Sequence, residues 1–354
     1  MLRSVRTLVP CLALAFGLPS LSHAYSACVG TAAELHTALS QASASTDVTA
    51  TIKVREGTYE ADGGNAFYLT QAHSGQTVSI SGGWSAACAT QRPGAESGTV
   101  LVGSTSVAAL QLATGFGTSG NTINATDLTL RNDQGILNDA VGACLHVVLN
   151  SGSTVKVYRA RLDGCVGSSA AIFDNSSGDL TFANSVVQGG FNAGAPVRSL
   201  NNNAVTRLAH LTITGNFATS TGQEASGLFV FAPASPGSQV TLDNSVVWGD
   251  IAPAGTPDIA TDGPGIIFTR AHYETRSNVN ALVTDNMPSH GNPGFVTPTN
   301  PRLRDNSPLV DSGVVLSIGG GTDADGHVRT QGGVVDVGAY ETDPDRILAD
   351  GFDR

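Results

Sequence analysis

The sequence predicts an all-β protein, most of which winds into a right-handed parallel β-helix, a solenoid of stacked coils. One indication is a repeat: LTFANSVVQGG, residues 180–190, returns as VTLDNSVVWGD, residues 240–250. A second is a period, because strands of this kind close on glycines 25, 26 and 34 residues apart, at Gly164, Gly189, Gly215 and Gly249. A third is composition, since 42 glycines and only 6% aromatic residues suit tight turns and small interior side chains.

Residues 1–24 have the pattern of a signal peptide. Two arginines precede the apolar run LVPCLALAFGLPSL, and small residues up to Ala24 offer a cleavage site before Tyr25. The run is too short to span a bilayer, and no other stretch of the sequence is long and apolar enough to do so. We therefore expect an exported mature chain without a membrane span.

An amphipathic helix is predicted over residues 31–43, TAAELHTALSQAS. Thr31 suits the N-cap position, Glu34 follows three residues later as in a capping box, and Leu35 and Leu39 fall on one face. A solenoid needs covered ends, because an open coil exposes unpaired strand edges. We expect this helix to cap the first coil and to form one unit with the coils over residues 25–290.

The coils are expected to fill most of this unit, in about ten turns at one strand spacing each. A single coil cannot bury its own apolar face, so each coil must be covered by its neighbours. The strand before each repeat strand ends on Asn150, Asn175 or Asn201. We predict that these asparagines take left-handed backbone at one turn and hydrogen-bond to their copy in the next coil.

Residues 291–342 differ in composition from the coils and contain the motifs SPLVDSG, DADGHVR and VDVGAYE. The residues that carry the pattern are Ser307, Pro308, Asp311, Gly313, Asp323, Asp325, Gly326, Arg329, Val335, Asp336, Gly338, Ala339, Tyr340 and Glu341. The region resembles the C-terminal domain of the bacterial choice-of-anchor Q proteins. The resemblance implies a β-helix protein exported to the surface of a bacterium. The tail, residues 343–354, carries no hydrophobic anchor or sortase-type motif, so anchoring and release both stay open.

The aspartates of this region allow two interpretations. Asp323, Asp325 and Asp336 could collect calcium, although the spacing from Asp323 does not fit an EF-hand loop. Alternatively, the aspartates cap turns and Arg329 pairs with Asp336 or Glu341. We expect no cofactor, with calcium left open.

The charge of the chain restricts its partners. The formal net charge is −11, and the chain has two lysines and no basic cluster. An acidic surface argues against nucleic acid or an anionic membrane as partner. We expect a monomer whose partner is an extended glycan or a surface protein.

Four cysteines follow the leader, an even number that suggests two disulfides in an oxidising compartment. In the predicted coils, Cys144 lies just before the first strand of a coil and Cys165 just after the last, so the two meet at one corner. Cys28 precedes the cap helix and Cys88 closes the first coil region. We predict the pairs Cys144–Cys165 and Cys28–Cys88.

Parallel β-helices also house polysaccharide lyases and hydrolases, which need a basic arginine beside carboxylates or two nearby acids. The closest approach to such a set is Arg159, Arg161 and Asp163, and the alternative is a solvated charge cluster. Equivalent positions of successive coils form two columns, in which neighbouring coils never offer two acids. They read Arg131, Asp163, Gln188, Thr214, Trp248 and Asp127, Arg159, Asn184, His210, Asn244.

Trp248 is the weak candidate for ligand binding, because an exposed indole is a platform for sugars. It could equally pack under an insertion expected at residues 222–239. Without assembled catalytic groups, the sequence favours a non-catalytic adhesin or a scaffold that binds a glycan or another partner. The alternative is a polysaccharide lyase or glycoside hydrolase.

Overall fold

The computed structural model describes residues 24–61, 64–96, 98–135, 141–150, 152–219, 224–233, 235–280, 283–318, 321–330 and 333–342. The predicted signal peptide, apart from Ala24, and the predicted tail at 343–354 lie outside these residues. Among the residues described, no helix is long and apolar enough to cross a membrane.

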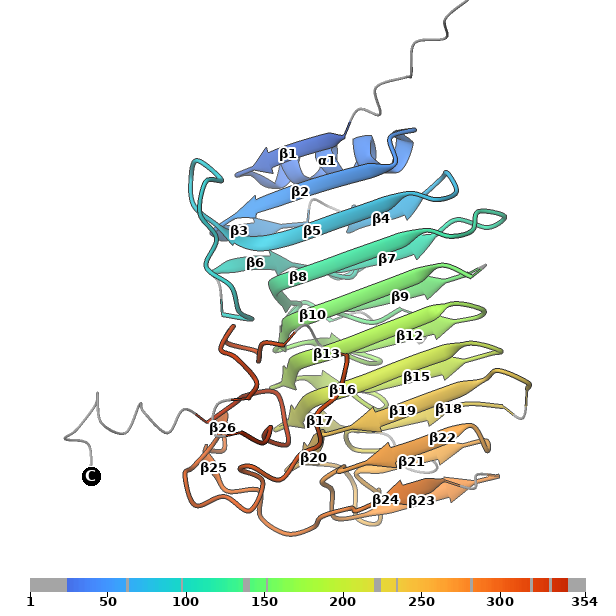
Figure 1. Ribbon diagram of the computed structural model, residues 1–354, viewed down its shortest axis with the longest axis vertical. Helices are drawn as coiled ribbons and strands as arrows, with labels where there is room; N and C mark the ends of the chain where they lie inside the picture. Colours follow the sequence, from blue (N-terminus) through green and yellow to red (C-terminus); the bar gives the residue numbers. More distant parts are fainter. Residues whose placement is uncertain are drawn as a thin grey trace, which may run out of the picture.

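The chain is a parallel β-helix, as predicted, and Figure 1 shows its coils stacked one above another from β1 to β24. One long parallel sheet runs down the stack. In spatial order it consists of β1 (Tyr25–Val29), β2 (Thr49–Arg55), β5 (Thr77–Trp84), β8 (Thr122–Arg131), β10 (Thr154–Asp163), β13 (Asp179–Gln188), β16 (Val205–Thr214), β19 (Gln239–Asp243), β22 (Ile266–Thr269) and β24 (Thr284–Asn286). Three short strands extend its coils, β3 (Gly57–Glu60), β6 (Thr99–Val102) and β20 (Val246–Trp248).

The other two walls of the solenoid are also parallel sheets. The second sheet consists of β4 (Phe67–Gln71), β7 (Leu110–Thr114), β9 (Leu145–Leu149), β12 (Ala171–Asn175), β15 (Val197–Asn201), β18 (Leu228–Phe231), β21 (Ile259–Asp262) and β23 (Arg276–Val279). The third is short, with β11 (Val166–Gly167), β14 (Phe191–Asn192) and β17 (Phe217–Ala218). A separate antiparallel hairpin, β25 (Phe295–Thr297) and β26 (Asn300–Leu303), follows the coils.

The strand register confirms the period that the sequence predicts. Val155 pairs with Leu180, Leu180 with Thr206 and Thr206 with Val240, so each repeat step is one turn of the solenoid. Alternating side chains of these strands point inward and are fully buried, among them Leu180 and Phe182. Burial of this kind is the main stabilising contribution, at roughly 25 cal/mol per Å² of apolar surface.

The predicted asparagine ladder is wrong in its backbone and in its partners. Asn175 pairs with Asn201, but it is Leu149, not Asn150, that stands opposite Asn175 in the coil before. The backbone at Asn175 is ordinary strand end. Its Nδ2 donates to the carbonyl of Val205 at 2.9 Å rather than to another asparagine. The side-chain amide of Asn175 therefore links its coil to the backbone of the next coil. It satisfies a buried backbone carbonyl, which needs a hydrogen-bond donor.

The left-handed backbone lies in the long sheet instead, at one residue per coil. We call these residues the left-handed column: Asp127, Arg159, Asn184, His210, Asn244 and Arg270, with φ between 46° and 61°. Arg159 and Asn184 stand at equivalent positions of β10 and β13, where the pairing ladder is interrupted in both strands without a shift of register. The left-handed residues therefore mark an aligned bend in the two strands, and their side chains make contacts outside the sheet.

The cap helix is confirmed as α1 (Ala32–Ala44), with Thr31 as N-cap. Thr31 Oγ1 accepts from Glu34 N at 3.2 Å, while the Glu34 carboxylate accepts from the amide of Gly30 instead of the N-cap amide. The sequence did not reveal β1, which precedes α1 and forms the outermost strand of the long sheet by pairing with β2. The LFVF segment of the predicted insertion is confirmed as a strand, since β18 pairs with β15 and β21.

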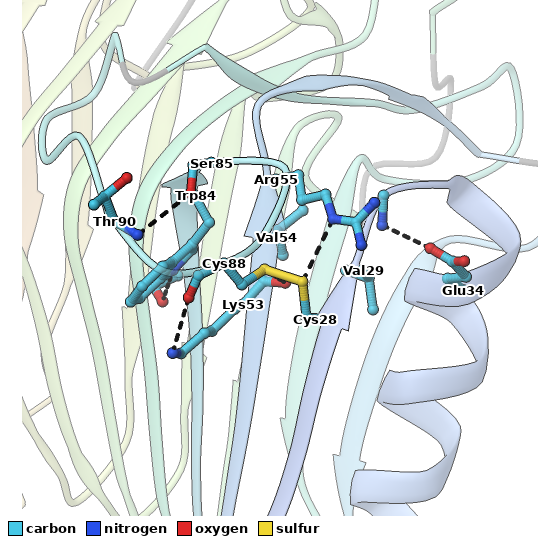
Figure 2. The surroundings of a disulfide bond; sticks show 12 residues. Cys28, Val29, Glu34, Lys53, Val54, Arg55, Trp84, Ser85, Cys88 and Thr90 are labelled. Atoms are coloured by element: carbon cyan, nitrogen blue, oxygen red, sulfur yellow. Dashed lines mark hydrogen bonds between the residues drawn. A yellow bond between two sulfur atoms is a disulfide. The ribbon is translucent and has the colours of Figure 1, made fainter.

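Both predicted disulfides are present. Cys144 and Cys165 have Cα atoms 5.8 Å apart, and Cys28 and Cys88 have Cα atoms 6.0 Å apart. Figure 2 shows the second bond reaching from β1 to the loop after β5, with Lys53 of β2 donating to the carbonyl of Cys88 at 3.3 Å. The bond therefore fastens the outermost strand to the second coil.

Candidate functional site

The C-terminal region, residues 291–342, lies along the left-handed column. Arg159 donates to Thr322 Oγ1 at 3.0 Å, and Asn184 accepts from Arg329 at 2.8 Å. Asn244 accepts from Val314 N through its side chain at 2.9 Å. These contacts involve Arg159, Asn184 and Asn244 from three coils, so the C-terminal region covers this part of the left-handed column, which includes the candidate catalytic residue Arg159. Figure 1 shows this segment in red beside β13 and β16.

Arg329 is at the centre of this contact, with a residue exposure of 5%. Its guanidinium donates to Asn184 and to the carbonyl of Ala339, and its Nη1 lies 3.6 Å from a Glu341 carboxylate oxygen. The predicted pairing of Arg329 with Glu341 is therefore confirmed. Burial lowers the pKa of Arg329 to about 10 and raises the pKa of Glu341 to about 8.

His210, the next member of the column, lies beneath the same segment. Burial and the nearby Arg329 charge hold the pKa of His210 well below its usual range. A neutral imidazole in this position can accept or donate a hydrogen bond, but it adds no second positive charge beside Arg329. Asn184 and His210, two members of the column, are thus neutral polar neighbours of the buried Arg329 cation.

The candidate catalytic groups each have an ion-pair partner. Arg159 forms two hydrogen bonds to the buried carboxylate of Asp127, with Nε–Oδ1 at 2.6 Å and Nη2–Oδ2 at 2.9 Å. Arg161 pairs with Glu96, and Asp163 lies 3.3 Å from Arg131. Arg161 Nη2 lies 4.0 Å from Asp163 Oδ1, so these two candidates are close together. Arg159 is not part of this group, because it pairs with Asp127.

These ion pairs continue into the C-terminal region. Glu96 also lies 3.5 Å from Arg302, which in turn forms two hydrogen bonds to Asp325 at 2.8 and 2.9 Å. The Arg302 guanidinium sits 4.3 Å from the centre of the Tyr340 ring. These ion pairs join β10, the loop after β5 and the C-terminal region. They therefore hold the C-terminal region against the coils. An arginine facing carboxylates stays charged, which opposes a role as general base.

The aspartates proposed for calcium act as turn acceptors. Asp323 accepts from the amides of His327 at 2.7 Å and Glu341 at 2.9 Å, and Asp336 accepts from the amides of Asp311 and Thr342. Asp323, Asp325 and His327 do bring one possible ligand atom each within 4.8 Å of one another, whereas Asp336 is not in that group. A cation there would have to displace Arg302 from Asp325.

Trp248 ends β20 and is half-buried. Its indole packs against an apolar cluster that includes Val246, Leu303 and Leu309, and its centroid is 5.8 Å from that of His272. Leu303, Leu309 and Val337 of the C-terminal region therefore supply the cover, and none of the described residues of the 222–239 segment belongs to this apolar cluster. A sugar platform needs an open ring face, and this packing reduces the area that Trp248 offers.

An exposed apolar strip on the third sheet was missed in the sequence. Val166, Phe191, Phe217 and Ile251 stand in register on successive coils. Phe191 is 51%, Phe217 40% and Ile251 60% exposed. The signal was available, because each of the four residues stands two positions after a repeat glycine. Contiguous apolar exposure of this kind marks interaction surfaces.

The two phenyl rings of the strip stack on one another, with centroids 5.1 Å apart and planes 4° from parallel. Their faces are therefore turned along the solenoid axis toward neighbouring side chains, and their edges point to solvent. Sugars stack on ring faces, so the strip suits an apolar partner surface better than a glycan.

No protein-family model matches the sequence, and no curated protein matches it either. Among solved structures, a crystal structure of the pectate lyase Pel9A aligns with 86% of this chain and 90% of that chain, at 13% identity and a TM-score of 0.30. A likeness at this level carries no argument about a site, and the fold rests on the strand pairing itself.

Proposed function

We propose that the chain is an exported, non-catalytic β-helix that acts outside a bacterial cell or at its surface. Its role is that of an adhesin or a scaffold that binds an extended glycan or a surface protein. The leader pattern of residues 1–24 supports export, and two disulfides suit an oxidising compartment. The resemblance of residues 291–342 to the choice-of-anchor Q domain supports a place at the cell surface.

One observation carries the non-catalytic assignment. The groups that a lyase or hydrolase would use on this face are already engaged, Arg159 with Asp127 and Arg161 with Glu96, and the C-terminal region lies over the column beside them. Catalysis needs an accessible acid or base whose pKa suits proton transfer. Charged pairs that bind a covering segment serve stability instead.

A polysaccharide lyase is the second candidate, and Glu96 is the observation that favours it. Its side chain is 46% exposed and lies beside two arginines, Arg161 and Arg302. The two guanidinium groups would bind the carboxylate of an acidic sugar, and the exposed Glu96 carboxylate would lie beside that sugar. The two candidates differ in whether bound glycan is cleaved.

Binding to a panel of extended glycans, acidic and neutral, tests the proposal with purified residues 25–354. We expect weak, saturable binding to at least one glycan, and we expect Arg161→Gln to leave that affinity within about twofold. Matched binding curves for the parent chain and the variant supply the measurement. Cleavage of the bound glycan by the parent chain, detected in the same mixtures as unsaturated products or new reducing ends and lost in Arg161→Gln, would contradict the proposal and favour the lyase.

A further inference from the structure

A groove opens beside the cap helix, between α1 and the first strands of the second sheet. Its volume is about 620 Å³, and its walls include His36 and Ser40 of α1, Asn65, Tyr68 of β4 and Gln111 of β7. This volume falls within the range of roughly 300–1,000 Å³ that is typical of small-ligand sites. The helix α1, which forms one wall of the groove, lies at the end of the stack opposite β24 (Figure 1).

Strand alternation places an aromatic ring and an amide side by side in this groove. Phe67 and Leu69 are fully buried in the core, so Tyr68 between them points outward, and it is 44% exposed. Tyr68 pairs in register with Gln111, which therefore points to the same outer side one strand away. The pair spans about one strand spacing, roughly 4.8 Å.

The helix wall is fixed by packing. The His36 ring stacks on Phe67, with centroids 4.6 Å apart and planes 26° from parallel. Ser40 follows one helical turn later, on the same face of α1. The groove therefore combines an aromatic ring, an amide, an imidazole and a hydroxyl on three elements, α1, β4 and β7.

We propose that this groove binds a neutral saccharide segment. An aromatic ring offers a face to the apolar side of a sugar, and side-chain amides and hydroxyls satisfy its hydroxyl groups. Among the residues that the structure describes, those that line the groove include no aspartate, glutamate, lysine or arginine. An uncharged wall favours neutral sugars, because the carboxylates of a uronate would lose hydration without gaining a cation.

This inference deepens the proposed function and rests on it. It assigns glycan binding to the cap groove and leaves the apolar strip for a different kind of contact. The two surfaces are separable, because Tyr68 lies on the second sheet near α1 whereas Phe191 lies on the third sheet, several coils away.

Isothermal titration of residues 25–354 with cellohexaose, xylohexaose, mannohexaose and maltohexaose tests the assignment. At least one of these neutral probes should bind, and Tyr68→Ala should weaken that binding about tenfold or more. Gln111→Ala should weaken it several-fold. Tyr68→Phe, which keeps the ring, and Phe191→Ala on the strip should both stay within about threefold of the parent affinity. Melting curves check that each variant is folded.

Three results would overturn the assignment of saccharide binding to the groove. Binding unchanged in folded Tyr68→Ala would place the saccharide elsewhere and leave the proposed function intact. Binding of polygalacturonate oligomers without any neutral probe would also refute the groove alone. The absence of binding by every glycan, neutral or acidic, would overturn the groove together with the glycan part of the proposed function.

Discussion

Each described coil from β8 to β22 carries one residue of the left-handed column, and the side chains of these residues make different contacts. Asp127 accepts a hydrogen bond from Arg159, Asn184 accepts one from Arg329, and Asn244 accepts one from the backbone amide of Val314. A left-handed residue costs about 1 kcal/mol in strain unless it is glycine or asparagine, so contacts must compensate at Arg159 and His210. The left-handed bend recurs in these coils, whereas the side chain that it carries differs and decides the contact with the C-terminal region.

Asn175 supports the coil contact at a buried turn. Asn175→Ala removes the hydrogen bonds from Asn175 Nδ2 to Val205 O and Thr206 Oγ1. It also removes the acceptor of the Gly178 amide, so that buried carbonyl and amide groups lose their partner. We expect the free energy of unfolding to fall by about 1–3 kcal/mol. Asn203→Gly is the control, because Asn203 is exposed with φ 57° and glycine tolerates that backbone. Chemical denaturation measures both, and equal losses would remove the turn asparagine from the account.

Asp250 is expected to make stability depend on pH. Its Oδ1 accepts from Asn216 N and Nδ2 at 2.8 Å each, and burial raises its pKa from 3.8 to about 8. Between these values the folded chain keeps a proton that the unfolded chain has released. The contribution of protonated Asp250 to the free energy of unfolding is therefore full below about pH 4. It is lost as the pH rises to 8, by up to about 1.4 kcal/mol per pH unit.

Asp250→Asn isolates this effect, since the amide oxygen can keep both bonds from Asn216. Unfolding followed from pH 4 to 8 should show a shallower fall in stability for the variant than for the parent chain. Identical pH profiles would mean that the Asp250 carboxyl is ionised in the folded protein.

At the scale of elements, the C-terminal region behaves as a strap on the long sheet. It is joined to the coils by buried polar contacts around Arg329 and by the ion pairs from Asp163 to Asp325 through Arg161, Glu96 and Arg302. Loss of one member of a buried pair leaves the other charge uncompensated, which costs about 3–5 kcal/mol. The strap is therefore expected to detach before the coils unfold.

Arg329→Met tests the strap directly. It keeps an apolar stem in the site but removes the charge beside Glu341 and the donors to Asn184 and Ala339. Hydrogen exchange should rise across residues 305–342 while β10 and β13 stay protected. Arg304→Met is the matched control, because Arg304 is surface-exposed and donates only to the Val296 carbonyl among the described contacts. Equal exchange in both variants would show that Arg329 does not hold the region.

At the scale of the whole molecule, the features that the sequence predicted are the periodic and local ones. The coil period, α1 and both disulfides follow from spacing, because each coil returns the chain to the same corner. The docking of the C-terminal region does not, since the contact of Asn184 with Arg329 joins residues 145 apart and no period encodes it. The turn asparagines were misread because a turn preference and a left-handed preference share the same residue type.

The candidate site was predictable to a smaller extent. The columns themselves were correct, as the Asp127–Arg159 and Arg131–Asp163 pairs demonstrate. Their cover was not visible, because the described residues of 291–342 form irregular structure apart from one hairpin. Isolated contacts that no strand pattern encodes hold them to the coils, among them the backbone bond from Gly338 to Asn244 and the side-chain bonds from Arg329 to Asn184. The cap groove was equally hidden, since it needs the relative position of α1 and β4.

Cleavage of a bound glycan is the measurement that most directly tests the central claim of a non-catalytic scaffold. Polygalacturonate, alginate and chondroitin are incubated with residues 25–354, with calcium and with chelator, and both unsaturated products and new reducing ends are followed. The account predicts neither product from any of these polysaccharides in any condition. Calcium-dependent turnover that disappears in Arg159→Ala or Arg161→Ala would contradict it and establish a lyase.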